Sequence, residues 1–243
     1  MSAALSAADQ ATRDIILILA DSKRLLGTRY AEWILGAPEL EAGIACASMA
    51  QDEWGHGRLL YALLKDFGED TDRIEHMRDP AEYRNIEVLD RSPASWPELI
   101  VLNAFVDAAL TVQLEALRES EYGPLKQRVA KLLDEEVFHA QHGVAWLNRL
   151  AAASDDAKAQ VKSAVQNALP LILRWFGEGQ EGDALRKEFL SRVQPLLDAT
   201  KVSADAPRFD NFNSTTRRSN TAGPDAATIT RVRGDKNRIY LMD

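Results

Sequence analysis

Apolar residues recur at helical spacing along most of the chain, and glycine or proline separates one run from the next. Between residues 7 and 35 the following apolar side chains fall on one helix face: Ile15, Ile16, Leu19, Leu26, Tyr30 and Trp33. Gly36 and Pro38 interrupt this helix, and we expect Pro38 in the first turn of a second helix that runs to about Phe67. The pattern predicts an antiparallel hairpin.

A second hairpin follows a polar connection. Trp96-Pro97-Glu98 is typical of a helix start, and the apolar pattern continues from there towards Glu121. Tyr122-Gly123-Pro124 then breaks the pattern, and a fourth long helix is predicted over residues 125–151.

Two more helices and a polar tail complete the chain. The helices are expected over residues 155–176, with a kink at Pro170, and over residues 183–197. From about residue 200 serine, threonine, asparagine, arginine and glycine dominate. We therefore predict a helical bundle domain over residues 1–200 and an extended or mobile tail over residues 201–243.

Composition narrows the class of protein. The formal net charge of −8 argues against a general nucleic-acid binder, because phosphate affinity depends on clustered lysine and arginine. The single cysteine, Cys46, excludes an internal disulfide framework. The chain starts without the basic and apolar segments of a signal peptide, and the apolar run over residues 15–20 is too short to span a membrane. We expect a cytoplasmic protein that binds neither membranes nor nucleic acid.

The residues that suggest chemistry are two Glu-x-x-His pairs, Glu53 with His56 and Glu136 with His139. Residues three apart project from the same helix face, so the carboxylate and imidazole of each pair can reach one metal ion. Each pair lies on the second helix of a predicted hairpin. This placement is typical of the ferritin-like di-iron carboxylate bundles, and the predicted fold is all-α, a ferritin-like four-helix bundle with additional C-terminal helices.

Such a site needs one more carboxylate from each of the other two helices. Asp107, 29 residues before Glu136, interrupts an apolar stretch of the third helix and is the candidate there. Thirty residues before Glu53, the first helix instead carries Lys23. Asp21, two residues earlier and about 200° around the helix from Lys23, is a possible substitute ligand.

This lysine changes the charge of the predicted site. Glu53, Asp107 and Glu136 supply three negative charges and Lys23 one positive charge, so the four together carry −2. That balance suits one divalent cation, or none if the ammonium occupies a vacated metal position. Two irons require Lys23 to be neutral or turned away, or Asp21 to replace it, and the sequence leaves these alternatives open.

Longer phrases around these residues resemble the phenylacetic acid catabolic proteins, the helical subunits of a multicomponent phenylacetyl-CoA epoxygenase. Residues 51–57 (QDEWGHG) and residues 120–143 are similar to the metal-binding phrases of that family's catalytic subunit. Residues 32–33 and 37–41 are instead similar to its non-catalytic structural subunit. The resemblance covers roughly residues 14–177.

The resemblance implies a di-iron site that activates O2 and adds one oxygen atom to the aromatic ring of an acyl-CoA substrate. Carried over by position, the ligands are Glu53, His56, Asp107, Glu136 and His139, and Lys23 is the one departure. It also implies a homodimer, or a hetero-oligomer with a related helical subunit, and a separate reductase as electron donor.

His142 and Cys46 are candidates to lie behind the ligands, although a surface imidazole and a small core residue are the simpler interpretations. The functional alternatives are an epoxygenase-type monooxygenase subunit, a silent structural subunit or paralogue, and iron or peroxide handling on a ferritin-like scaffold.

Overall fold

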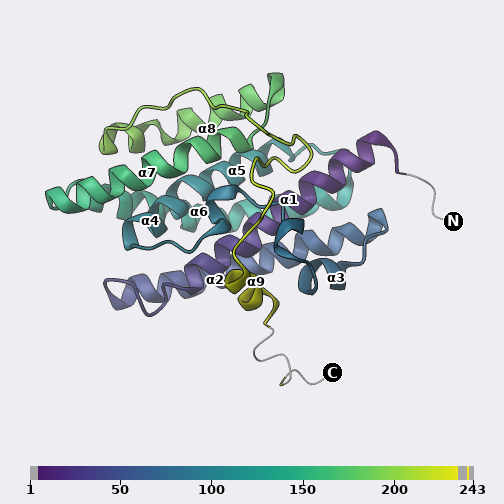
Figure 1. Cartoon of the computed structure of the whole chain (residues 1–243), viewed down its shortest axis with the longest axis horizontal. Coiled ribbons are helices and arrows are strands. Elements are labelled where there is room, and N and C mark those ends of the chain that lie inside the picture. Colours follow the sequence, from purple (N-terminus) through teal and green to yellow (C-terminus); the bar gives the residue numbers. More distant parts are fainter. Residues whose placement is uncertain (1–4, 235–239, 241–243) are drawn as a thin grey trace.

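The computed structural model of the chain describes residues 5–234 and residue 240. Within these residues the secondary structure is helical, without a strand, which confirms the all-α prediction. Two helical hairpins form a central bundle, and further helices cover one side of it (Figure 1).

The first hairpin consists of α1 (Ala7–Ala31) and α2 (Leu40–Leu63), and a 3₁₀ turn (Leu64–Phe67) extends α2. The Ser6 side chain caps α1 by accepting a hydrogen bond from the Asp9 amide. Two expectations are wrong in detail. Helix α1 ends at Ala31 because residues 32–36 form turns, and Pro38 precedes α2 because the extended residue Glu39 is its N-cap.

The second hairpin consists of an interrupted helix and of α6 (Gly123–Ala151). The interrupted helix comprises α4 (Trp96–Val101), a π-helical segment (Leu102–Val106) and α5 (Asp107–Ala116), so it ends before the expected Glu121. A Cβ atom added to Gly143 of α6 would lie only 3.0 Å from the backbone N and Cα of Ala104. The glycine therefore lets α6 approach the π-helical segment closely.

The stretch Trp96–Ala116 is also long and apolar enough to cross a membrane by length and composition alone. Inside the protein, 78% of its most apolar window is buried, as expected for a helix at the centre of a bundle.

Helices α7 (Asp155–Trp175) and α8 (Gly179–Thr200) form the covering layer, and the short α3 (Thr71–His76) lies in the connection between the hairpins (Figure 1). Each covering helix contains a proline, Pro170 in α7 and Pro195 in α8. Helix α8 is longer at both ends than expected. Its N-cap is Glu178, and Lys201 in the left-handed conformation ends it.

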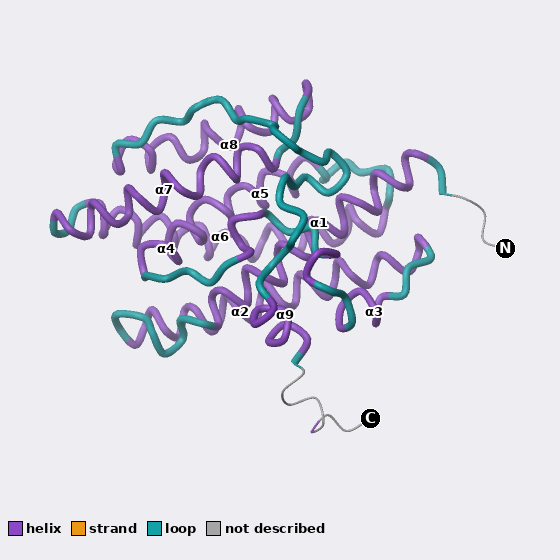
Figure 2. Tube along the Cα trace, in the orientation of Figure 1, coloured by secondary structure: helices purple, strands orange, loops and turns teal. Residues whose placement is uncertain are grey.

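The segment after α8 crosses the bundle without regular structure and ends in α9 (Ala226–Arg233), which packs beside the first hairpin (Figure 2). Buried contacts hold this segment in place. The Arg218 guanidinium donates to Asp90 Oδ2 at 2.6 Å, and Arg29 in α1 donates to Thr228 Oγ1 at 3.1 Å. Residues 235–239 and 241–243 of the predicted tail lie outside the described residues, and the domain division at residue 200 remains a prediction.

Candidate metal centre

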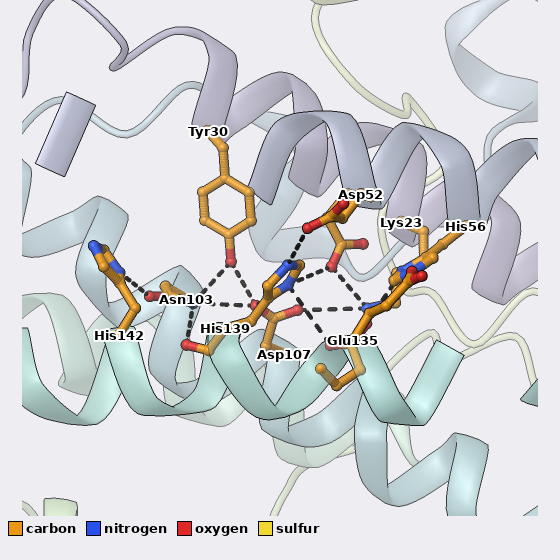
Figure 3. Close-up of polar contacts among 11 residues, drawn as sticks. Lys23, Tyr30, Asp52, His56, Asn103, Asp107, Glu135, His139 and His142 are labelled. Atoms are coloured by element: carbon orange, nitrogen blue, oxygen red, sulfur yellow. Dashed lines mark hydrogen bonds and ion pairs between the residues drawn. The ribbon is translucent and has the colours of Figure 1, made fainter. Parts of the chain in front are cut away.

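The four helices of the two hairpins bring six sequence-predicted side chains into one buried cluster (Figure 3). Every member is at most 2% exposed. Helices α1 and α5 each contribute one residue, and α2 and α6 each contribute a Glu-x-x-His pair. The cluster consists of Lys23, Glu53, His56, Asp107, Glu136 and His139.

The Lys23 ammonium lies at the centre of the carboxylates. Its Nζ donates to Glu136 Oε1 at 2.6 Å, to Glu53 Oε1 at 2.9 Å and to Asp107 Oδ1 at 3.5 Å. An ammonium has three N–H donors, and each has a carboxylate acceptor here. The attraction of these carboxylates outweighs the opposing effect of burial and raises the pKa of Lys23 above its usual range, so the side chain is charged.

The two imidazoles are arranged symmetrically. His56 Nδ1 lies 3.2 Å from Glu136 Oε1, and His139 Nδ1 lies 3.1 Å from Glu53 Oε1. Both Nε2 atoms face outward, where the Glu135 carboxylate lies 2.6 Å from His56 and the Asp52 carboxylate lies 3.4 Å from His139. Each half-exposed carboxylate thus lies next to the histidine of the opposite helix, and each fixes the orientation of that imidazole.

Glu135 and Asp52 were missed in the sequence analysis. The available signal is the acidic residue that directly precedes the glutamate in both pairs, Asp52 before Glu53 and Glu135 before Glu136.

The imidazoles add positive charge to the cluster. Burial disfavours a charged His139, but Asp107 and Glu53 outweigh burial and raise its pKa to about 11. Burial also opposes charge on His56, and Glu136 and Glu53 again raise its pKa. Lys23 and two protonated imidazoles would supply as many positive charges as Glu53, Asp107 and Glu136 supply negative ones, so the cluster can reach charge balance without a metal ion.

Asp107 is held by a further layer of hydrogen bonds. Its Oδ2 accepts from Tyr30 OH at 2.6 Å and from Asn103 Nδ2 at 3.1 Å. Asn103 belongs to the π-helical segment, and its Oδ1 lies 2.8 Å from His142 Nδ1. His142 is therefore linked to the cluster through Asn103.

Cys46 is fully buried, and burial raises the pKa of its thiol to about 11. Among the described residues, the Cys46 side chain forms no hydrogen bond with any of the six cluster members.

Asp21 does not reach the cluster. It is fully buried on another side of α1, where it accepts hydrogen bonds from Tyr61 OH at 2.6 Å and from the Arg84 amide at 2.8 Å. It also forms a buried ion pair with Arg78. The alternative in which Asp21 replaces the missing carboxylate is thus wrong for this structure, because its oxygens already have these partners.

A di-iron centre, which the four-helix arrangement suggests, does not fit these side chains as they stand. The ammonium uses one oxygen of each of the three carboxylates, and the fourth ligand position is the lysine itself. Three atoms of the cluster are buried without a hydrogen bond in the described part of the chain, namely Glu53 Oε2, Glu136 Oε2 and His56 Nδ1, although His56 Nδ1 is within ion-pair distance of Glu136 Oε1. These atoms are the donors that a metal would use if the ammonium were displaced.

Comparisons with protein families and with curated proteins both found matches. A family model described as "Phenylacetic acid catabolic protein" matches residues 2–222. Two curated relatives are from Escherichia coli (strain K12), and both are named as subunits of 1,2-phenylacetyl-CoA epoxidase. One relative is 24% identical over 192 residues, and the other is 27% identical over 202 residues.

The matches differ in how much of each relative they cover. The 24% match includes 72% of this chain but only 62% of the relative, so the chain spans less than two thirds of that protein. The 27% match includes 82% of this chain and 80% of the relative.

Proposed function

Since the chain belongs to the phenylacetic acid catabolic protein family, we propose that it acts in phenylacetate catabolism as a helical subunit of a phenylacetyl-CoA epoxidase-type enzyme. Within that enzyme we assign it a supporting role. The Lys23 ammonium takes the place of the metal ions, and a related helical subunit with a complete ligand set binds the iron, receives electrons from a reductase and oxidises the acyl-CoA substrate.

One observation carries this proposal: a fully buried lysine whose three N–H donors are all directed at the would-be metal ligands. A cation is required among three buried carboxylates, because an uncompensated buried charge costs several kcal/mol, on the order of 3–5. The ammonium meets that requirement permanently, whereas a metal would have to displace it. The cluster therefore stabilises the bundle and does not need iron.

The second candidate function is an iron-binding oxygenase chain with one or two metal ions. It is favoured by the inward Nδ1 atoms and by the unpartnered carboxylate oxygens. Both candidates predict the same fold and the same subunit family, so the metal content of the purified chain separates them.

The direct experiment is anaerobic loading of the full chain with ferrous iron, removal of free metal, and determination of iron per chain. We expect less than one iron per chain in the wild type. Two tightly bound irons would contradict the supporting role, and one would support the single-metal form of the second candidate.

Substitution of Lys23 tests whether its ammonium is what keeps iron out of the cluster. Lys23→Glu restores the fourth carboxylate, and we expect it to increase bound iron towards two per chain. Lys23→Met removes the ammonium without adding a ligand, and Lys126→Glu changes a half-exposed surface lysine by the same charge. If Lys126→Glu increased iron binding as much as Lys23→Glu, the gain would reflect net charge and not the geometry of the cluster.

A further inference from the structure

The outward sides of α2 and α6 form an apolar surface. The two helices lie next to each other along their length. Near one end Glu39 pairs with Arg149 at 3.0 Å, and near the other Tyr122 OH donates to Asp66 at 2.6 Å. Large apolar side chains are exposed where these helices point away from the cluster. They are Leu40, Ile44, Val137, Phe138 and Val144, and we call them the apolar face.

Charged residues are missing from the same stretches of the two helices. Residues 42–51 of α2 and residues 137–148 of α6 contain no aspartate, glutamate, lysine or arginine. A stretch of α7 with the same length as that of α6, residues 155–166, exposes four charged residues: Asp155, Asp156, Lys158 and Lys162. Depletion of charge together with enrichment of aromatic side chains is typical of the core of a protein interface.

The apolar face is as large as an interface requires. Phe138 is 72% exposed and Leu40 is 75% exposed, and the five side chains together offer on the order of 500 Å² of apolar surface. Each partner of a standard interface contributes about 800 Å², of which roughly 65% is apolar in homodimers. The apolar face therefore supplies about the apolar area that one partner of a dimer buries.

The composition of the apolar face also limits what can cover it. Nucleic acids and anionic membranes are bound through clusters of lysine and arginine, which the two uncharged stretches lack. A strongly charged protein would likewise gain no electrostatic attraction from this surface. An apolar surface of this size therefore favours an equally apolar partner surface, and the chain itself provides one.

The register of the two helices makes the apolar face complementary to a copy of itself. Asp52 of α2 is level with His139 of α6, so in this antiparallel pair residues 45–48 are level with Val144. The accessible residues in that range are small, namely alanine and serine. A copy turned by 180° about an axis along the helices would place its α2 over α6 of the first copy at the same level. Large side chains then meet small ones in two identical contacts.

We propose that the apolar face is the contact between two copies of this chain, related by a two-fold axis, with α6 of each copy packed against α2 of the other. The inference does not rest on the proposed function, because it concerns the outer side of the hairpins and not the metal content of the cluster. Asp52 and Glu135 are half exposed between α2 and α6, and each already faces an imidazole. Each carboxylate therefore keeps its partner when a second copy covers it.

The test is sedimentation velocity of the purified full chain at concentrations between about 1 and about 100 µM. The chain has a mass of 27.0 kDa, and we expect a species of twice that mass to dominate at about 10 µM, with a Kd at or below about 1 µM. A chain that stays monomeric at about 100 µM overturns the proposal, and the occupant of the face is then a protein of different sequence.

Two substitutions place the contact on both helices. Ile44→Asp on α2 and Phe138→Asp on α6 each change an exposed side chain, so circular dichroism should show unchanged helical content. Each added charge occurs twice in a symmetric dimer, and we expect each variant to weaken dimerisation at least about hundredfold. Met77→Asp is the matched control, because Met77 is 53% exposed outside the apolar face, and its dimer should be as stable as that of the wild type. An unchanged dimer in either face variant overturns the assignment.

Discussion

Replacing Lys23 with methionine removes the central charge of the cluster and keeps a side chain of similar length. Glu53, Asp107 and Glu136 then remain buried without their shared ammonium. In the wild type, burial alone would raise the pKa of Asp107, but Lys23 and His139 outweigh burial and hold this pKa well below its usual range. The variant loses the attraction of Lys23, which is the strongest single interaction that lowers this pKa.

The expected loss follows from the burial of all four groups. Removing one partner of a buried ion pair typically costs about 3–5 kcal/mol. His139 remains as a compensating cation, because the carboxylates raise its pKa to about 11, so we expect a value near the lower end, about 3 kcal/mol. For a chain of this size that corresponds to a decrease in Tm of roughly 6–12 °C.

The loss of stability caused by Lys23→Met should increase as the pH rises. Burial already raises the pKa of Glu53 in the wild type despite the attraction of Lys23, and without the ammonium the folded-state pKa rises further above the unfolded value. A carboxyl whose folded pKa is raised destabilises the fold once the pH exceeds its unfolded pKa, near 4.3 for glutamate. The difference in free energy of unfolding between wild type and variant should therefore be larger at pH 8 than at pH 5.

Urea unfolding followed by circular dichroism at these two pH values measures the effect. Lys126→Met is the control, because Lys126 is half exposed and its partner Glu119 is 85% exposed, so its loss should leave the free energy of unfolding unchanged within error. A difference below about 1 kcal/mol for Lys23→Met at both pH values would refute the view that the ammonium compensates the carboxylates.

Three further substitutions probe the helix packing near the site and the ion pair that holds the C-terminal segment. Gly143→Ala forces a methyl group to 3.0 Å from Ala104 and should lower the free energy of unfolding by about 1–3 kcal/mol. Gly55→Ala, with open space around it in α2, should raise the free energy of unfolding by about 0.5–1 kcal/mol. Thermal melts in which both variants shift Tm in the same direction would contradict this reasoning. Arg218→Met leaves Asp90 buried without its cation, so limited proteolysis should cleave residues 201–234 faster than in the wild type, and equal cleavage rates would show that this pair does not hold the segment.

Much of the bundle and of its charged cluster follows from local periodicity. The two Glu-x-x-His pairs lie on α2 and α6 as expected. Residues three apart project from the same face of any regular helix, so the spacing alone predicts that each pair points in one direction. Lys23 faces Glu53 because the two helices of a hairpin run antiparallel, so that a separation of thirty residues brings two positions to the same level. Whether the chain binds metal stays a prediction.

Other features depend on contacts that local patterns do not encode. Asp52 and Glu135 resemble ordinary polar residues of a helix surface, and only the packing of α2 against α6 brings them to the histidines. Arg78 lies in the irregular connection between the hairpins, whose path the pattern does not reveal, so its pairing with Asp21 was not anticipated. The π-helical segment likewise lies where Gly143 of α6 approaches Ala104, a contact between two helices that the local pattern does not reveal.

The packing of α9 and Arg218 against the first half of the chain has a consequence for biosynthesis. Within residues 5–234, Arg218 is the cation that pairs with Asp90, and the hydrogen bond from Arg29 to Thr228 joins positions 199 apart in the sequence. Since the chain is synthesised from its N-terminus, nine-tenths of it must be translated before Arg29 of the first hairpin and Asp90 of the connection between the hairpins can acquire these partners. Until then both charged groups lack contacts that the finished protein provides, so a chain that stalls near residue 200 is a natural substrate for chaperones and proteases.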